Sequence, residues 1–72
     1  MTPLSVYHVV PDDRNGWKVK LEGADVGSQG YRDKLEAVAR ARQLARLSDA
    51  GRVVIHRADG TVEAQEECGR AA

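Results

Sequence analysis

The sequence predicts a small α+β domain in which one helix packs on one face of a four-stranded antiparallel sheet. Two segments with strand composition come before a single helical segment and two more follow it, which gives the element order ββαββ. A chain of 72 residues suits one domain with a thin core. We therefore expect a single small domain over 1–72, with an ordered core of about residues 4–66 and a flexible tail over 67–72.

The first two strands are expected to form a hairpin. Residues 4–10 are rich in β-branched and aromatic side chains, and Pro11, which cannot donate to a strand ladder, is expected to end this strand. The following turn contains Asn15-Gly16, a pair that tolerates positive φ. Residues 17–21 then alternate apolar and basic side chains, as a strand with one buried face does.

The middle of the chain is expected to form a loop and then the helix. Residues 22–30 contain three glycines and show no hydrophobic period, which predicts a loop. Asp33 can cap a helix with Glu36 as its third residue, and Gly51 is expected to end the helical region. One side of this helix is apolar and mostly alanine: Ala37, Val38, Ala41, Leu44 and Ala45.

The second hairpin follows the helix. Residues 52–57 and 61–65 have strand composition, and the residues between them, 58–60, form a turn. Strand order 2-1-3-4 makes every neighbouring pair antiparallel and places the two most apolar strands in the middle, as central strands tend to be. Order 1-2-3-4 is the less favoured alternative, because it requires a parallel crossover between the second and third strands.

With one helix, one face of this sheet is expected to stay uncovered. Tyr7 and Val9 are assigned to the helix side, because an imidazole buried in a thin core needs a partner, and this leaves His8 outside. The same side is expected to hold Trp17, Val19, Val53, Ile55 and Val62. The uncovered face then carries four polar candidate binding residues beside three valines: His8, Lys18, Lys20 and His56, with Val6, Val10 and Val54.

Three interpretations fit such a face. It is a solvated surface with no binding role, an interface for another protein or a second copy of the chain, or a site for single-stranded nucleic acid. The formal net charge is zero, so the chain lacks the long-range field that draws in nucleic acid or membrane surfaces. Only three aromatic residues are present, one Trp and two Tyr, and stacking on exposed rings is the usual way to hold single strands. A non-enzymatic binding or regulatory module that uses this face or an edge strand is favoured, and nucleic-acid binding is the alternative.

The sequence does not predict a metal or cofactor site. His8, His56 and Cys68 come from distant segments and lack the paired spacing of a zinc site. A single cysteine fits a reducing compartment, and the segment Met1-Thr2-Pro3-Leu4 lacks the features of a signal peptide. We expect a cytoplasmic protein that contacts no membrane.

A set of short motifs extends over residues 6–66. They are His8-Val9-Val10-Pro11, Gly16-Trp17-Lys18-Val19-Lys20, Glu36-Ala37 with Ala41 and Leu44-Ala45, Val54-Ile55-His56, and Asp59-Gly60-Thr61-Val62. Together they resemble the small bacterial family known as domain of unknown function 2188, in which no reaction is assigned. The resemblance implies a compact stand-alone domain, and both histidines fall on positions of the family pattern. The final residues, from Cys68 to Ala72, depart from the family's usual tail.

A fainter similarity is to HicB-type antitoxin domains, which bind a small toxin partner. It rests on a strand hairpin, a glycine-containing loop and a helix that opens with Glu-Ala. The proline-rich segment that characterises those domains before the helix is absent from this sequence.

Overall fold

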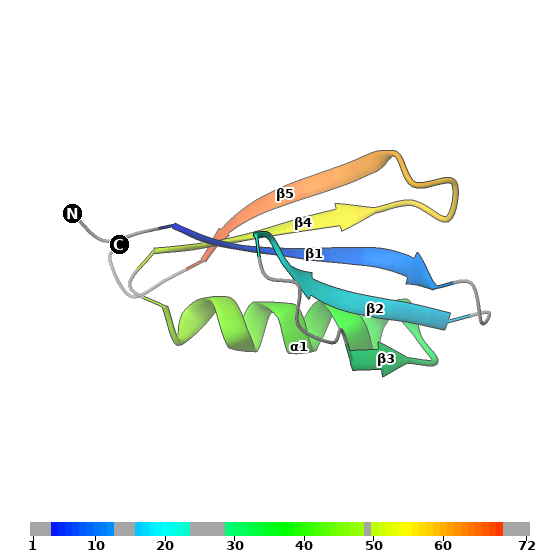
Figure 1. The fold of residues 1–72 in the computed structure, drawn as a ribbon, viewed down its shortest axis with the longest axis horizontal. Helices are drawn as coiled ribbons and strands as arrows, with labels where there is room; N and C mark the ends of the chain where they lie inside the picture. Colours follow the sequence, from blue (N-terminus) through cyan, green and yellow to red (C-terminus); the bar gives the residue numbers. More distant parts are fainter. Residues whose placement is uncertain (1–3, 13–15, 24–28, 49, 69–72) are drawn as a thin grey trace.

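A computed structural model describes residues 4–12, 16–23, 29–48 and 50–68. These residues form a five-stranded sheet in the order β3-β2-β1-β4-β5, with one helix against one face (Figure 1). The prediction of an α+β fold with one helix on a sheet is confirmed. The elements along the chain are β1 (Ser5–Asp12), β2 (Gly16–Leu21), β3 (Gln29–Tyr31), α1 (Lys34–Arg46), β4 (Gly51–His56) and β5 (Val62–Cys68).

The predicted four-stranded antiparallel sheet is wrong in strand number and in one strand direction. The four expected strands take the favoured order, but β3 adds a fifth strand and β4 runs parallel to β1. The two errors have one cause. β3 reverses the chain once more before α1, so β4 enters the sheet in the same direction as β1 instead of the opposite one.

β3 lies inside the segment that the sequence predicts to be a loop. Its three residues have no apolar period, and they form a strand because they pair with β2, with Trp17 opposite Tyr31 and Lys18 opposite Gly30. The approach is close at the start of β2, where a Cβ on Gly16 would lie 2.6 Å from the Tyr31 carbonyl oxygen. Gly16 is therefore a strand residue opposite Asp12, not the turn residue expected from its sequence, while Asn15 lies outside the described residues.

β1 does not end at Pro11, as the sequence suggests, but continues to Asp12. β4 pairs with β1 only from Ser5 to Val9, so at Pro11 the strand has its neighbour on the β2 side alone. A proline is tolerated at such a position because its missing N–H leaves no ladder bond unmade.

Two further element ends differ from the prediction. α1 ends at Arg46 with Leu47 as its C-cap, and Gly51 opens β4 instead of ending the helix. A Cβ on Gly51 would collide with the Ala45 carbonyl oxygen, so glycine lets β4 start directly beside the end of α1. β5 continues through Cys68, two residues into the predicted tail, while residues 69–72 lie outside the described part of the chain.

The start of α1 agrees with the sequence in position and differs in its cap. Asp33 is the N-cap residue, with extended backbone, but its side chain makes no capping hydrogen bond. The backbone carbonyl of Asp33 accepts a hydrogen bond from the Ala37 N–H at 3.2 Å. The expected capping box with Glu36 is therefore wrong, and packing of the apolar side holds the helix in place.

The core lies between α1 and the sheet. Its buried residues are Val9, Val19, Ala37, Val38, Ala41, Ala45, Val53 and Ile55, with Tyr7, Trp17, Tyr31, Leu44 and Cys68 half-buried against them. The predicted inner positions of β1, β2, β4 and the helix are confirmed. Alanines bring the helix close to the sheet, at a cost of about 0.8 kcal/mol for each methylene group that is not buried.

Val62 is the exception among the predicted inner residues. The register between β4 and β5 shifts between Ile55 and His56, which places Val62 opposite His56. Paired residues share a face of the sheet, so Val62 belongs to the uncovered face, and it is 45 % exposed.

Candidate functional site

The sheet face opposite α1, called here the open face, carries all four predicted binding residues. Val9, Val19, Val53 and Ile55 pack in the core, so the residues that alternate with them along the strands point the other way. His8 of β1 pairs with Lys20 of β2, and Val10 pairs with Lys18. His56 follows on β4, two positions after Val54, the partner of His8.

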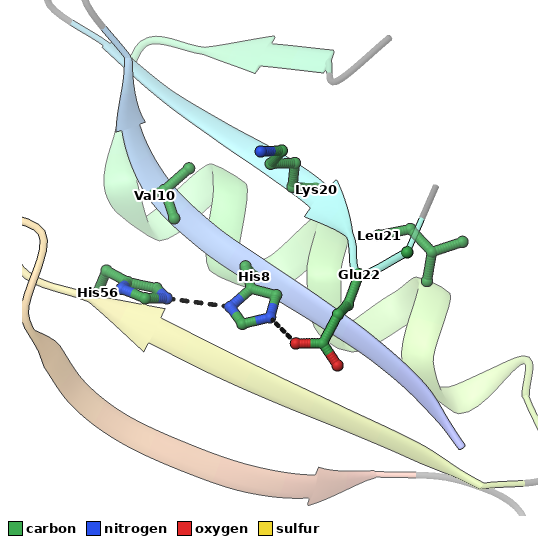
Figure 2. A pocket seen from close by; sticks show the side chains of 7 residues that line it. His8, Val10, Lys20, Leu21, Glu22 and His56 are labelled. Carbon is green, nitrogen blue, oxygen red and sulfur yellow. Dashed lines mark hydrogen bonds and ion pairs between the residues drawn. The ribbon is translucent and has the colours of Figure 1, made fainter. Parts of the chain in front are cut away.

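His8 and His56 are in direct contact on this face (Figure 2). The His8 Nδ1 atom lies 3.0 Å from the His56 Nε2 atom. The ring centroids are 5.3 Å apart and the ring planes are tilted by 40°. Two residues 48 positions apart in the sequence meet because the parallel register of β1 and β4 places them diagonally across neighbouring strands.

The second ring nitrogen of His8, on the side away from His56, is hydrogen-bonded to a carboxylate. His8 Nε2 lies 3.0 Å from the Glu22 Oε1 atom, and the side chain of Glu22 is 61 % exposed against 22 % for His8. Glu22 directly follows β2, and its backbone N–H donates to the Val6 carbonyl at 2.8 Å. This backbone bond fixes the start of the Glu22 side chain beside the His8 ring.

The second ring nitrogen of His56, on the side away from His8, is hydrogen-bonded to a backbone carbonyl in the turn between β4 and β5. His56 Nδ1 lies 2.9 Å from the Gly60 oxygen. Gly60 has φ +91°, a left-handed conformation that glycine adopts readily. Asp59 Oδ1 accepts from the Thr61 hydroxyl at 2.6 Å and from the Thr61 N–H at 3.0 Å, and these bonds lower the pKa of Asp59. The turn is therefore held in the conformation that presents the Gly60 carbonyl to His56.

These partners determine where the ring protons lie. A carbonyl oxygen and an ionised carboxylate can only accept, so His56 carries a proton on Nδ1 and His8 carries one on Nε2. Two neutral rings then leave lone pairs on His8 Nδ1 and His56 Nε2, which face each other. Two facing lone pairs repel each other, so this close contact requires either a proton shared between the two nitrogens or a cation bound to both.

A pocket of about 440 Å³ adjoins the histidine pair. Figure 2 shows the two rings and Glu22 in a row across β1, with Val10 and Lys20 beside them. The lining combines polar groups at the histidines with apolar side chains and reaches the end of β2: His8, Val10, Lys20, Leu21, Glu22, Gly23 and His56. Lys18 lies further along β2, opposite Val10, and does not line the pocket.

The glutamates of β5 are neutralised by ion pairs. Glu66 accepts hydrogen bonds from Arg42 of α1, at 2.7 Å from Nη2 and at 3.1 and 3.2 Å from Nε, and these bonds raise the pKa of Arg42. The hydrogen bond from Lys34 lowers the pKa of Glu63.

On the open face, Glu67 pairs with Arg52 Nε at 2.8 Å. Among the described residues, no ion pair includes Lys18 or Lys20. β2 is therefore the basic side of the open face.

The three residues that the sequence offered as metal ligands, His8, His56 and Cys68, do not all come together, because only the two histidines are in contact. Cys68 packs against the core on the helix side, so the sheet separates it from the two histidines. Over the described ranges, no group of three or more His, Cys, Asp or Glu side chains could hold a metal ion. The sequence places His8 and His56 on one face of the sheet but does not predict their contact, because the contact depends on the parallel register of β1 and β4. It places Glu22 and Gly60 only in a loop and a turn.

One further feature concerns membranes. In the described part of the chain, no helix has the length and apolar character needed to cross a bilayer.

Comparison with known proteins gives one match. The family described as "Uncharacterized protein conserved in bacteria (DUF2188)" matches residues 7–68, in agreement with the resemblance seen in the sequence motifs. No curated protein and no solved structure matches. The similarity to HicB-type antitoxin domains is not shown by these comparisons.

Proposed function

This chain belongs to the DUF2188 family of uncharacterised bacterial proteins, and from that premise we propose a function on the basis of its own surface. The proposal is a non-enzymatic module that binds another protein through the open face of its sheet. The main support for this proposal is that the open face combines accessible valines with a basic strand. Val62 is 45 % exposed, Val6 and Val10 are half-buried, and Lys20 is exposed.

The charge pattern favours an acidic partner. Lys18 and Lys20 stand on alternate positions of β2, next to the half-buried Val6 and Val10 of β1. A partner segment with carboxylates on one side and apolar side chains on the other matches both features. Rim charges of this kind mainly raise association rates and select the partner, while the apolar contacts supply most of the affinity.

A second copy of the chain is a poorer match for this surface. In the described residues, Glu63, Glu66 and Glu67 are already paired with basic side chains, and Glu22 binds His8. These carboxylates are not available to the lysines of a neighbouring copy without breaking an existing pair. Self-association is therefore the alternative outcome of the test.

Nucleic-acid binding is the other alternative. Tyr7, Trp17 and Tyr31 all pack against the core on the helix side. Within the ranges that the structure describes, no phenyl or indole ring stands on the open face for a base to stack on. The two histidines are engaged with each other and with Glu22, so they are poorly placed to bind phosphate groups.

The non-enzymatic part of the proposal is supported by the position of Cys68. Its half-buried side chain packs on the helix side, away from the histidines that would have to activate it. The chain has a single cysteine, which fits a reducing compartment, so we propose a cytoplasmic location.

The test is a backbone-amide NMR titration with synthetic 12-residue peptides. One peptide alternates Glu and Val, and the matched control alternates Lys and Val. We expect shifts on β1 and β2, centred on Val10, Lys18 and Lys20, with the acidic peptide alone. A matched pair of variants adds a second readout: Lys18→Gln with Lys20→Gln should weaken binding about tenfold, since loss of two rim charges costs about 1.4 kcal/mol, while Arg40→Gln on the exposed side of α1 should leave it unchanged.

Three results would overturn this reading. Shifts with a pool of short single-stranded oligonucleotides that disappear at moderate salt would assign the face to nucleic acid. Shifts on the open face that depend only on protein concentration would assign it to a second copy. No response on the open face to either peptide would contradict this face as the site for an acidic segment.

A further inference from the structure

We propose that His8 and His56 form a binding site for a divalent transition-metal ion of the Zn²⁺ class on the open face. The proposal goes beyond the binding of a protein partner and does not depend on it. The sequence places both histidines on the uncovered face but predicts no metal site, because their spacing lacks the paired pattern of a zinc site. Its basis is the convergence of two ring nitrogens whose opposite nitrogens are already occupied.

The hydrogen bonds around the two rings have the arrangement that metal-binding histidines require. A histidine that binds a metal through one nitrogen usually donates the other N–H to a carboxylate or a backbone carbonyl, which fixes the tautomer and orients the ring. His8 donates to the Glu22 carboxylate at 3.0 Å, and His56 donates to the Gly60 carbonyl at 2.9 Å. The two remaining nitrogens, His8 Nδ1 and His56 Nε2, thereby face each other.

The separation of the two free nitrogens fits a shared ion. Zn–N bonds of about 2.0–2.1 Å place two nitrogens about 3.3 Å apart at a tetrahedral angle and about 2.9 Å apart at a right angle. The observed distance between His8 Nδ1 and His56 Nε2 is 3.0 Å. The rings need only pivot so that both lone pairs meet at a point beside the line that joins the two nitrogens.

The surroundings leave room for such an ion. The pocket of about 440 Å³ adjoins both rings, so water can complete the coordination shell, as it does where a metal site keeps open positions. The nearby charges nearly cancel. Glu22 is bound to His8, Lys20 lies opposite His8 on β2, and on β4 the charge of Arg52 is paired with Glu67.

The experiment uses the full chain without a histidine tag, labelled with ¹⁵N in the imidazole rings. Zn²⁺ is added as its chloride at pH 7.5, with no other ligand. We expect one equivalent to shift the signals of His8 Nδ1 and His56 Nε2, while His8 Nε2 and His56 Nδ1 keep their protons. The measurement is made on the unmodified protein, so it does not depend on how any variant folds.

Variants then separate the two ligands from their supports. His8→Ala and His56→Ala should each abolish saturable binding in calorimetry. Glu22→Gln should weaken binding about tenfold, because it removes the carboxylate that orients His8. Cys68→Ser is the matched control: it removes a metal-binding side chain on the opposite side of the sheet and should leave the affinity unchanged.

The proposal is overturned if excess Zn²⁺ leaves the ring signals unmoved and a proton remains between the two nitrogens. It is also overturned if binding survives in His56→Ala, which would place the ion elsewhere. Neither result bears on the peptide titration, so the failure of this proposal can be told apart from the failure of the proposed function.

Discussion

The two faces of the sheet can be compared within three consecutive residues of β4. Val53 and Ile55 point toward α1 and are 0 % and 6 % exposed, while Val54 points to the open face and is still only 7 % exposed. On the helix side, burial comes from alanines and valines packed against one another. On the open side, Val54 has His8 of β1 and Gln65 of β5 as its cross-strand partners. One strand thus contributes packing on one face and a polar site on the other.

The largest expected effect is Ala41→Leu, which adds volume between α1 and the sheet. Ala41 is fully buried, so the larger side chain has to displace the helix. Over-packing of this kind costs about 3 kcal/mol in the free energy of unfolding, measured by urea denaturation followed by circular dichroism. Ala39→Leu at an exposed position of the same helix should change stability by less than about 0.5 kcal/mol. Equal effects of the two variants would contradict a close helix–sheet contact.

The next comparison truncates neighbouring valines on opposite faces. Val53→Ala opens a cavity that no neighbour fills, and we expect a loss of about 2.5 kcal/mol in the free energy of unfolding. Val54→Ala should cost about 1 kcal/mol, because water and the side chains of the open face can move into the space. Both values come from the same denaturation experiment. If Val54→Ala proves the more costly, packing on the open face contributes more to stability than the core on the helix side.

The smallest expected effect is a loss of stability at low pH through the Lys34–Glu63 ion pair. Lys34 lowers the pKa of Glu63 below its ordinary value of 4.5, so the pair stabilises the fold at neutral pH, and this contribution is lost as the pH falls through the lowered pKa. Glu63→Gln should therefore be less stable than the original protein at pH 7, and the difference should be smaller at pH 3, where more of Glu63 is protonated. Urea denaturation at both pH values gives the comparison. A difference that stays constant with pH would show that the glutamate acts by packing and not by charge.

Local patterns carry much of the fold. The alternation in residues 17–21 and the apolar side of α1 predict the core residues of these two elements correctly, because burial of one face imposes a period on the sequence. β3 has no such period. Gln29–Tyr31 become a strand through pairing with β2, and an interaction that arises only in the folded state leaves no local signal.

The candidate site shows the same limit. The positions of His8, Lys18, Lys20 and His56 on the open face follow from alternation along the strands, and the structure places all four there. The contact between the two histidines follows from the parallel register of β1 against β4. The direction of β4 depends in turn on β3, a strand that the sequence does not predict. Glu22 is held beside His8 by a backbone hydrogen bond to Val6, and a backbone bond cannot be predicted from the residue types involved.

The parallel pairing of β1 with β4 also bears on the order of events during synthesis. Tyr7 pairs with Val53, so the central strand of the sheet meets one of its two neighbours only after most of the chain has left the ribosome. Until then β1 and β2 can form a hairpin, but β1 keeps one open edge and the alanine side of α1 has no complete sheet to pack on. Closing so long a loop makes the folding of a 72-residue chain slower than its size alone suggests. The pairing of β1 with β4 is also the pairing that brings His56 to His8.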